Sequence, residues 1–163
     1  MLSQTPFLRI GHLAESDQQV LKQNSVPISV RAASEADLGA IARIQAAAPT
    51  ASQWEPAGYL DYDCRVAGLD DRIAGFLVSR TTGLETEILN LAVAPEFRRR
   101  GVARALVSDL LARRSGEFFL EVRESNQAAQ RFYESCGFRV LGSRREYYHS
   151  PAETAVVMKL HSC

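Results

Sequence analysis

The segment NLAVAPEFRRRGVARALV, residues 90–107, joins a short apolar run to a helical pattern through four arginine residues and one glycine. We expect a strand that closes at Val93, because Pro95 cannot donate to a strand ladder. From Arg100 onward, apolar residues recur at helical intervals. Three consecutive arginines at the start of a helix oppose its macrodipole, which favours anions at that end. The segment therefore predicts an anion-binding site where the strand meets the helix.

The loop between strand and helix offers two kinds of group to an anion. The first N–H groups of a helix have no acceptor inside it and can donate to a phosphate, and Gly101 permits close approach of the backbone. Guanidinium groups add bidentate contacts to phosphate oxygens, although arginines at a helix start can also serve only to solvate it. The residues predicted to cradle a pyrophosphate are Arg98, Arg99, Arg100, Gly101, Val102, Ala103 and Arg104.

Composition limits the classes of protein and partner. The chain has 163 residues, of which 46% are hydrophobic and 23% charged, as in a globular protein with a core. A formal net charge of zero argues against a nucleic-acid partner. The three cysteines fit neither a disulfide framework nor a zinc site, so we expect no metal and a cytoplasmic location. No apolar run reaches the roughly 18 residues of a membrane span, so no membrane partner is expected.

The domain organisation follows from the order of the predicted elements. Residues 1–26 are predicted to be an N-terminal extension without the features of a signal peptide, with a short helix over residues 15–22. Residues 27–163 are predicted to form a single domain in the order β-α-α-β-β-β-α-β-α-β-β, with Ser34 and Asp37 capping the first helix. Because strands and helices mix without strict alternation, we expect a mixed α/β fold with a mostly antiparallel central sheet flanked by helices.

Several motifs resemble those of one protein family. The residues RRRGVA fit the Q/R-x-x-G-x-G/A signature of the GCN5-related N-acetyltransferase (GNAT) family. Four segments are similar to its branch of ribosomal-protein alanine N-acetyltransferases, and they lie at residues 90–97, 120–129, 132–138 and 144–148. The resemblance covers residues 28–160 and implies the GNAT fold.

The same resemblance implies that the chain is an enzyme, an acetyl-CoA-dependent N-acetyltransferase. The acceptor that it implies is a protein N-terminal α-amine of the ribosomal-protein alanine type, and the chain is expected to act as a monomer or a homodimer. Two alternatives stay open. In the first, the chain is an acetyltransferase whose acceptor is a small amine, an amino acid or a lysine side chain. In the second, the chain is a non-catalytic module that binds acetyl-CoA.

The resemblance also implies which residues contact acetyl-CoA. The backbone of the strand before the loop pairs with the pantetheine arm, and the loop of residues 99–104 binds the pyrophosphate, with Arg98 at the Q/R position of the signature. Asn126 contacts the cosubstrate as well. The residues of the strand that pair with pantetheine are Leu91, Ala92 and Val93.

Two residues have side chains that suit acetyl transfer to an amine. The attacking amine has to be neutral, which at neutral pH costs only about 1 kcal/mol for an α-amine with a pKa of about 7.7–8.0 and more for a lysine with a pKa of about 10.4. The resemblance implies that Glu121 is the general base, although its pattern also fits the solvent face of an edge strand. Tyr133 is implied to contact the CoA sulfur and to act as general acid, with a packing tyrosine as the alternative.

Five further residues are candidates for contact with the acceptor, each with a structural alternative. Glu85 and Glu87 either bind a cationic amine or are exposed carboxylates at a strand edge. Trp54 either contacts the acceptor or fills the core. Asn90 either lines the acceptor channel or belongs to a strand bulge, and Tyr147 either lines the peptide groove or alternates in a strand.

Overall fold

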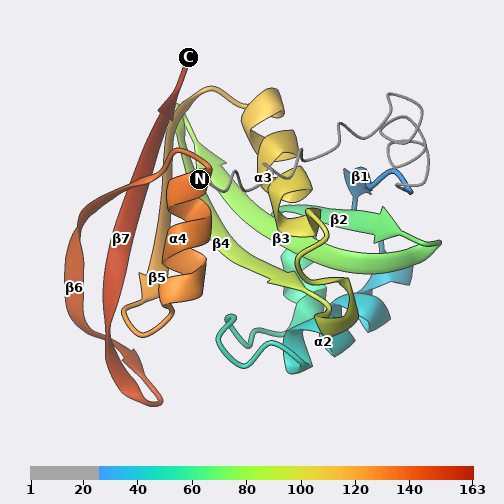
Figure 1. The fold of residues 1–163 in the computed structure, drawn as a ribbon, viewed down its shortest axis with the longest axis horizontal. Coiled ribbons are helices and arrows are strands. Elements are labelled where there is room, and N and C mark those ends of the chain that lie inside the picture. Colours follow the sequence, from blue (N-terminus) through green and yellow to red (C-terminus); the bar gives the residue numbers. More distant parts are fainter. Residues whose placement is uncertain (1–25) are drawn as a thin grey trace, which may run out of the picture.

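A seven-stranded sheet of strand order β1-β2-β3-β4-β5-β7-β6 runs through residues 26–163, which are the part of the chain that the computed structural model describes (Figure 1). Its strands are β1 (Ser29–Ala32), β2 (Asp63–Leu69), β3 (Arg72–Thr82), β4 (Glu85–Val93), β5 (Gly116–Arg123), β6 (Arg139–His149) and β7 (Ala152–Ser162). The α-helices are α2 (Leu38–Ala46), α3 (Val102–Arg113) and α4 (Gln127–Ser135), and the short 3-10 helices are η1 (Glu35–Asp37), η2 (Pro56–Asp61) and η3 (Pro95–Phe97). The helix predicted over residues 15–22 lies outside the described residues, and the predicted boundary at residue 27 stays a prediction.

The element order agrees with the predicted order, and local signals explain several ends. Asp37 accepts a hydrogen bond from the N–H of Ser34 at 2.8 Å, which completes the predicted capping box. The second predicted helix is the 3-10 helix η2, which begins at Pro56. In β4 the strand ends at Val93, and the polypeptide then turns through η3 into α3.

The sheet is divided between β4 and β5. Every other pair of neighbouring strands is antiparallel, which confirms the mostly antiparallel sheet. Strands β4 and β5 are parallel, and their pairing covers only four residue pairs, from Glu85 opposite Glu117 to Ile88 opposite Leu120. Beyond Ile88 the two strands diverge (Figure 1). The C-terminal halves of β4 and β5 thus flank an opening inside the sheet.

A β-bulge marks the point where β4 leaves β5. Asn90 pairs with Val78 of β3, but Ile88 pairs with the next residue, Ser79, so Leu89 is the extra residue in β4. A bulge bends its strand and increases the local twist. Because the bulge directly follows the last pair between β4 and β5, it accounts for the divergence of the two strands.

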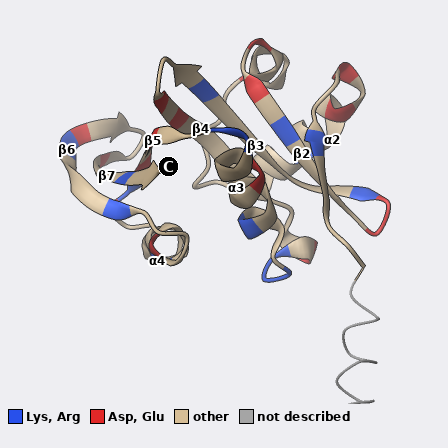
Figure 2. Ribbon diagram, turned by 90° about the horizontal axis from the view of Figure 1, so that it is seen from above, with Lys and Arg blue, Asp and Glu red and all other residues tan. Residues whose placement is uncertain are grey.

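The contacts of two adjacent residues of β3, Gly75 and Phe76, show which helices cover each face of the sheet. The ring of Phe76 lies 5.7 Å from that of Tyr59 in η2, whereas a Cβ atom at Gly75 would lie 2.9 Å from Val102 of α3. Side chains alternate between faces, so α2 and η2 cover one face and α3 covers the other, together with α4 (Figure 2). The same Cβ atom would lie 2.9 Å from the carbonyl oxygen of Ala92, so the close packing of α3 requires glycine at this position.

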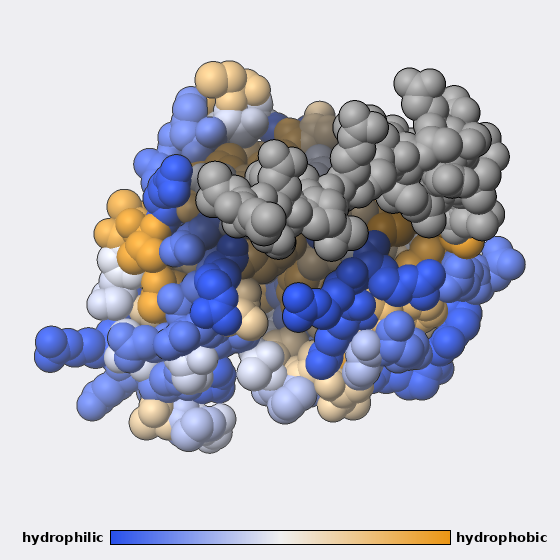
Figure 3. Space-filling model, in the orientation of Figure 1, coloured by the Kyte–Doolittle hydropathy of each residue, from blue (hydrophilic) through white to orange (hydrophobic). Residues whose placement is uncertain are grey.

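The edges of the sheet are β1 and β6, and β5 is an interior strand. The alternative for Glu121, the solvent face of an edge strand, is therefore wrong. The edge strand β6 is exposed along most of its length, including Val140 and Leu141, and apolar surface lies over it in Figure 3. Trp54 is 45% exposed, so the alternative that it fills the core is also wrong. Among residues 26–163, no helix combines the length and the apolar character that crossing a membrane requires.

Candidate active site

The start of α3 has the geometry of an anion site. Gly101 is the residue before the helix and has φ +84°, a left-handed conformation that glycine adopts without strain. The first hydrogen bond into the helix runs from the N–H of Ala105 to the carbonyl of Gly101 at 3.0 Å. The N–H groups of the first turn therefore have no acceptor inside the helix. They belong to Val102, Ala103 and Arg104 and are available to a phosphate.

The four arginine side chains of this loop are directed mainly to protein groups. Arg98 donates to the carbonyl of Ala47 at 3.4 Å, and Arg100 forms a 3.0 Å ion pair with Asp70. Arg104 contacts the end of α4, and Arg99 has no hydrogen bond or ion pair to any residue in the described range. The backbone of the turn is thus the pre-formed part of the predicted cradle. Contact of the guanidinium groups with an anion stays a prediction.

Arg104 connects the two helices that lie over the divided part of the sheet. Its guanidinium donates to the hydroxyl of Ser135, at the end of α4, at 2.8 Å, and it lies 4.0 Å from the sulfur of Cys136. Since α3 follows β4 and α4 follows β5, this contact links the two sides of the opening. Between these two sides, the edge of β4 beyond Ile88 has no pairing with β5.

The open edge of β4 fits an extended ligand. Past the bulge, β4 pairs with β3 through Leu91, Ala92 and Val93, while its other edge has no pairing with β5. A strand with one free edge presents N–H and C=O groups that an extended chain can pair with. The residues present therefore fit a pantetheine arm, followed by a pyrophosphate at the start of α3.

Tyr133, on α4, is held in the packed interior. It is 7% exposed on α4, and its ring lies 5.1 Å from that of Phe132 and 5.6 Å from that of Phe138. Burial raises the pKa of the Tyr133 hydroxyl, so the group keeps its proton at neutral pH. Asn126 caps the same helix, because its side-chain oxygen accepts the N–H of Ala129 at 3.2 Å.

Glu121 projects from the opposite face of the sheet. In β5 the buried residues Phe118, Leu120 and Val122 alternate with it, so its side chain lies on the face of α2 and η2. The carboxylate accepts a hydrogen bond from Arg144 of β6 at 2.5 Å. Glu121 thus lies on the face of the sheet opposite to α4, the helix that carries Tyr133. The roles of the two residues as base and acid stay predictions.

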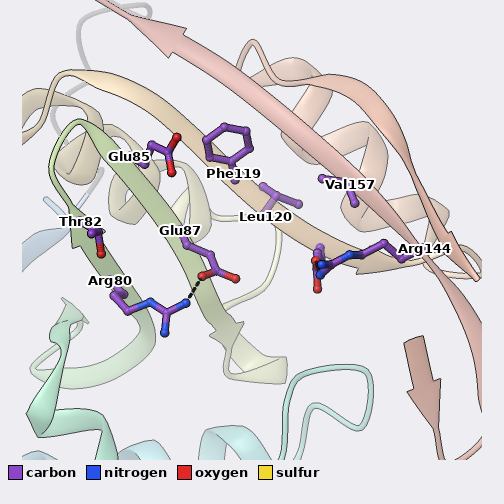
Figure 4. Close-up of a pocket in the computed structure, with 9 residues that line it drawn as sticks. Arg80, Thr82, Glu85, Glu87, Phe119, Leu120, Arg144 and Val157 are labelled. Carbon is purple, nitrogen blue, oxygen red and sulfur yellow. Dashed lines mark hydrogen bonds and ion pairs between the residues drawn. The ribbon is translucent and has the colours of Figure 1, made fainter. Parts of the chain in front are cut away.

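A pocket of about 400 Å³ extends from Glu121 across this face (Figure 4). It lies over β3, β4, β5 and β7, and Figure 4 shows Arg80 paired with Glu87 on one side and Arg144 on the other. Its lining residues are Arg80, Thr82, Glu85, Glu87, Phe119, Leu120, Glu121, Arg144 and Val157. The structure therefore brings the predicted acceptor contacts Glu85 and Glu87 into one pocket with the predicted base.

Tyr147 and Trp54 lie outside the lining of this pocket. The ring of Tyr147 lies 5.4 Å from the guanidinium of Arg144, and interaction with the Glu121 carboxylate, with partial burial, raises the pKa of Tyr147 to about 12. Trp54 lies in the loop before η2, with its ring 6.1 Å from that of Tyr59. Tyr147 therefore belongs to the surroundings of Glu121, whereas Trp54 belongs to the loop after α2.

A buried chain of hydrogen bonds, which the sequence did not predict, connects this loop to the bulge. Asn90 donates to the carbonyl of Ser52 at 2.9 Å and to the hydroxyl of Tyr59 at 2.8 Å. Tyr59 in turn donates to Gln45, which donates to the carbonyl of Trp54 at 2.7 Å. Asn90 directly follows the bulge, in agreement with the first alternative, and it does not line the pocket, so a place in the acceptor channel stays a prediction. The only signal in the sequence was a glutamine on the apolar face of α2.

The fold and this site together define the class of the protein. The acetyltransferase (GNAT) family model matches residues 36–138, more than half of the chain. The chain therefore belongs to the GNAT family, whose members are N-acetyltransferases that use acetyl-CoA. The predicted family, fold and cosubstrate are confirmed, while the roles of individual residues stay predictions.

Two curated relatives and one solved structure are similar to this chain within the family. The chain is 40% identical over 98 residues to the [Ribosomal protein bS18]-alanine N-acetyltransferase of Haemophilus ducreyi. The aligned region covers 56% of this chain and 68% of the relative. It is 38% identical over 86 residues to the N-alpha-acetyltransferase RimI of Mycobacterium tuberculosis, over 52% of this chain and 54% of the relative. The crystal structure of the ribosomal-protein-S18-alanine N-acetyltransferase from Escherichia coli superimposes with a TM-score of 0.72 and 28% identity, over 84% of this chain and 96% of that chain.

Proposed function

We propose that this chain transfers the acetyl group of acetyl-CoA to the α-amine of a protein N-terminus, an alanine of a ribosomal protein. The observation that carries the proposal is the opening between β4 and β5, with Glu121 on one face of the sheet and Tyr133 on the other. The names of the relatives support a ribosomal alanine as the acceptor.

The proposed site for acetyl-CoA consists of three parts. The free edge of Leu91, Ala92 and Val93 pairs with the pantetheine arm. The N–H groups at the start of α3 donate to the pyrophosphate, whose charge the helix dipole also favours. The loop arginines, led by Arg98, add positive charge, and Asn126 lies at the start of α4, on the other side of the opening.

The chemistry follows from the two titratable groups beside the opening. Acetyl-CoA supplies a thioester, in which the bond between the carbonyl carbon and sulfur breaks as the amine nitrogen bonds to that carbon. Glu121 accepts the proton that the attacking amine loses, directly or through a water molecule. Tyr133 donates its hydroxyl proton to the sulfur, so that CoA leaves as the neutral thiol. A backbone N–H of the β4 edge stabilises the negative charge that develops on the carbonyl oxygen.

The decisive experiment compares acceptors at one concentration of acetyl-CoA. Release of CoA is measured with a peptide that begins with alanine, with the same peptide acetylated at its N-terminus and carrying one lysine, and with small amines. We expect turnover with the free alanine peptide and little with the others. Turnover only with the lysine peptide or a small amine contradicts the proposed acceptor, and binding of CoA without any turnover contradicts the proposed enzyme activity.

A further inference from the structure

The carboxylate of Glu121 is paired with a positive charge, the guanidinium of Arg144, in the pocket of about 400 Å³ described above. Its contact with Arg144 is an ion pair of 2.5 Å, in which the Glu121 side chain is 16% exposed and that of Arg144 is 59% exposed. The pairing register between β6 and β7 shifts between Arg144 and Tyr148, and Glu146 within this shift has a positive φ of 52°. An irregular segment of the edge strand thus holds both Arg144 and Tyr147 near the predicted base.

The one lining carboxylate of the pocket without an ion pair to a described residue lies far from Glu121. The lining contains three carboxylates and two guanidinium groups. Arg80 pairs with Glu87 at 2.6 Å, so Glu85 is the lining carboxylate with no ion pair in the described part of the chain. Glu85 lies opposite Glu117, and Glu121 is four residues further along β5, a separation of about 13 Å at about 3.3 Å per residue. That distance exceeds the screening length of about 8–10 Å at moderate salt.

A neutral site beside Glu121 treats charged and uncharged amines differently. An ammonium group gains little attraction from a carboxylate whose charge is compensated, and the nearby guanidinium repels it. At pH 7.5 about a third of α-amines are uncharged, whereas only about 0.1% of lysine side chains are, given pKa values of about 7.8 and 10.4. The ion pair therefore weakens binding of the protonated lysine side chain, which is the form that lysine nearly always has at this pH. It does not affect binding of the uncharged α-amine.

We propose that Arg144 is a specificity-determining residue: by neutralising the carboxylate of Glu121, it directs the site to acceptors with an uncharged attacking amine, an α-amine in place of a lysine side chain. This inference rests on the proposed function. It assigns to one side chain of β6 a selection that the catalytic groups alone do not make, because Glu121 without its partner would attract any cation.

The test compares Arg144→Ala and Arg144→Gln with Arg144→Lys, which keeps the charge. For each enzyme, kcat/KM is measured at pH 7.5 and about 0.1 M salt, where the screening length is about 10 Å, with the alanine peptide and with the N-terminally acetylated lysine peptide. We expect the ratio of the two values to fall at least about tenfold in both neutral variants, mainly through a lower KM for the lysine peptide. Tenfold corresponds to about 1.4 kcal/mol. In Arg144→Lys the ratio stays within about twofold of the wild-type value.

Arg145→Ala is the matched control, because it removes a neighbouring positive charge of the same exposed segment. Arg145 has no ion pair with a described residue and does not line the pocket. An unchanged ratio in the neutral Arg144 variants, or an equal fall in Arg145→Ala, overturns the inference. Failure of the proposed function has a different result, namely a wild-type enzyme that prefers the lysine peptide or acetylates neither peptide.

Discussion

Replacement of Asn90 by alanine tests the buried link between the bulge of β4 and the loop after α2. Asn90 is 5% exposed and donates two hydrogen bonds, to the carbonyl of Ser52 and to the hydroxyl of Tyr59. Each such bond contributes about 1 kcal/mol net, and an acceptor left buried without a donor adds to the loss. We therefore expect Asn90→Ala to lower the free energy of unfolding by about 2–3 kcal/mol, or Tm by about 4–12 °C.

Ser79 provides the matched control for this prediction. It lies on β3 beside the same bulge and is fully buried, and its hydroxyl has no hydrogen-bond partner in the described part of the chain. Ser79→Ala removes an unpaired polar group and is expected to leave stability unchanged or to raise it slightly.

Urea unfolding measures both effects, followed by circular dichroism and by the fluorescence of Trp54, the one tryptophan of the chain. A loss below about 0.5 kcal/mol in Asn90→Ala would refute the reasoning, since that is within the range of ordinary surface substitutions. An equally large loss in Ser79→Ala would also refute it, because the cost would then come from any change beside the bulge.

Four other predictions concern catalysis, binding, packing and pH. Glu121→Gln should lower kcat by at least about 10²-fold while the Kd for acetyl-CoA, measured by calorimetry, stays the same; an unchanged rate removes it as the base. Arg98→Ala should raise the Kd for CoA, and an unchanged Kd would mean that the backbone cradle suffices. Gly75→Ala should cost about 1–3 kcal/mol in urea unfolding, because the new methyl group meets β4 and α3; a neutral effect contradicts the packing argument. Hydrogen bonds from Arg31 hold the pKa of Asp37 below its ordinary value, so the stabilisation is complete above about pH 4 and is lost as the pH falls further. Asp37→Asn should therefore destabilise the protein at pH 7 and less so at pH 3, and an equal effect at both pH values contradicts the assignment.

Features that depend on residues close in sequence were predictable. The end of β4, the start of α3 and its glycine, and the capped start of the first helix all follow from turn and capping chemistry over a few residues. The fold class followed from the order of the elements, and the family motifs agreed with it. The left-handed Gly101 before α3 belongs to this local class as well, whereas anion binding at this turn stays a prediction.

Features that depend on strand order were not predictable. The periodicity of β5 separated Glu121 from the apolar face of the strand but did not show what lies opposite its side chain, because a pattern of alternation is the same in an edge strand and an interior strand. The ion pair with Arg144 joins residues 23 positions apart through β7, and the contact of Asn90 with Tyr59 spans 31 positions. Such contacts appear only once the register of the whole sheet is known.

The short parallel pairing between β4 and β5 has a thermodynamic consequence. The four residue pairs are the only strand pairing between two half-sheets, β1 to β4 and β5 to β7, within residues 26–163. A ligand that pairs with the free edge of β4 and also contacts α4 adds a second seam between the halves. Its binding energy then becomes folding energy by linkage, about 2.7 kcal/mol at a ligand concentration 100 times its Kd. If acetyl-CoA binds in this way, its concentration relative to its Kd contributes to the free energy of unfolding of the whole sheet.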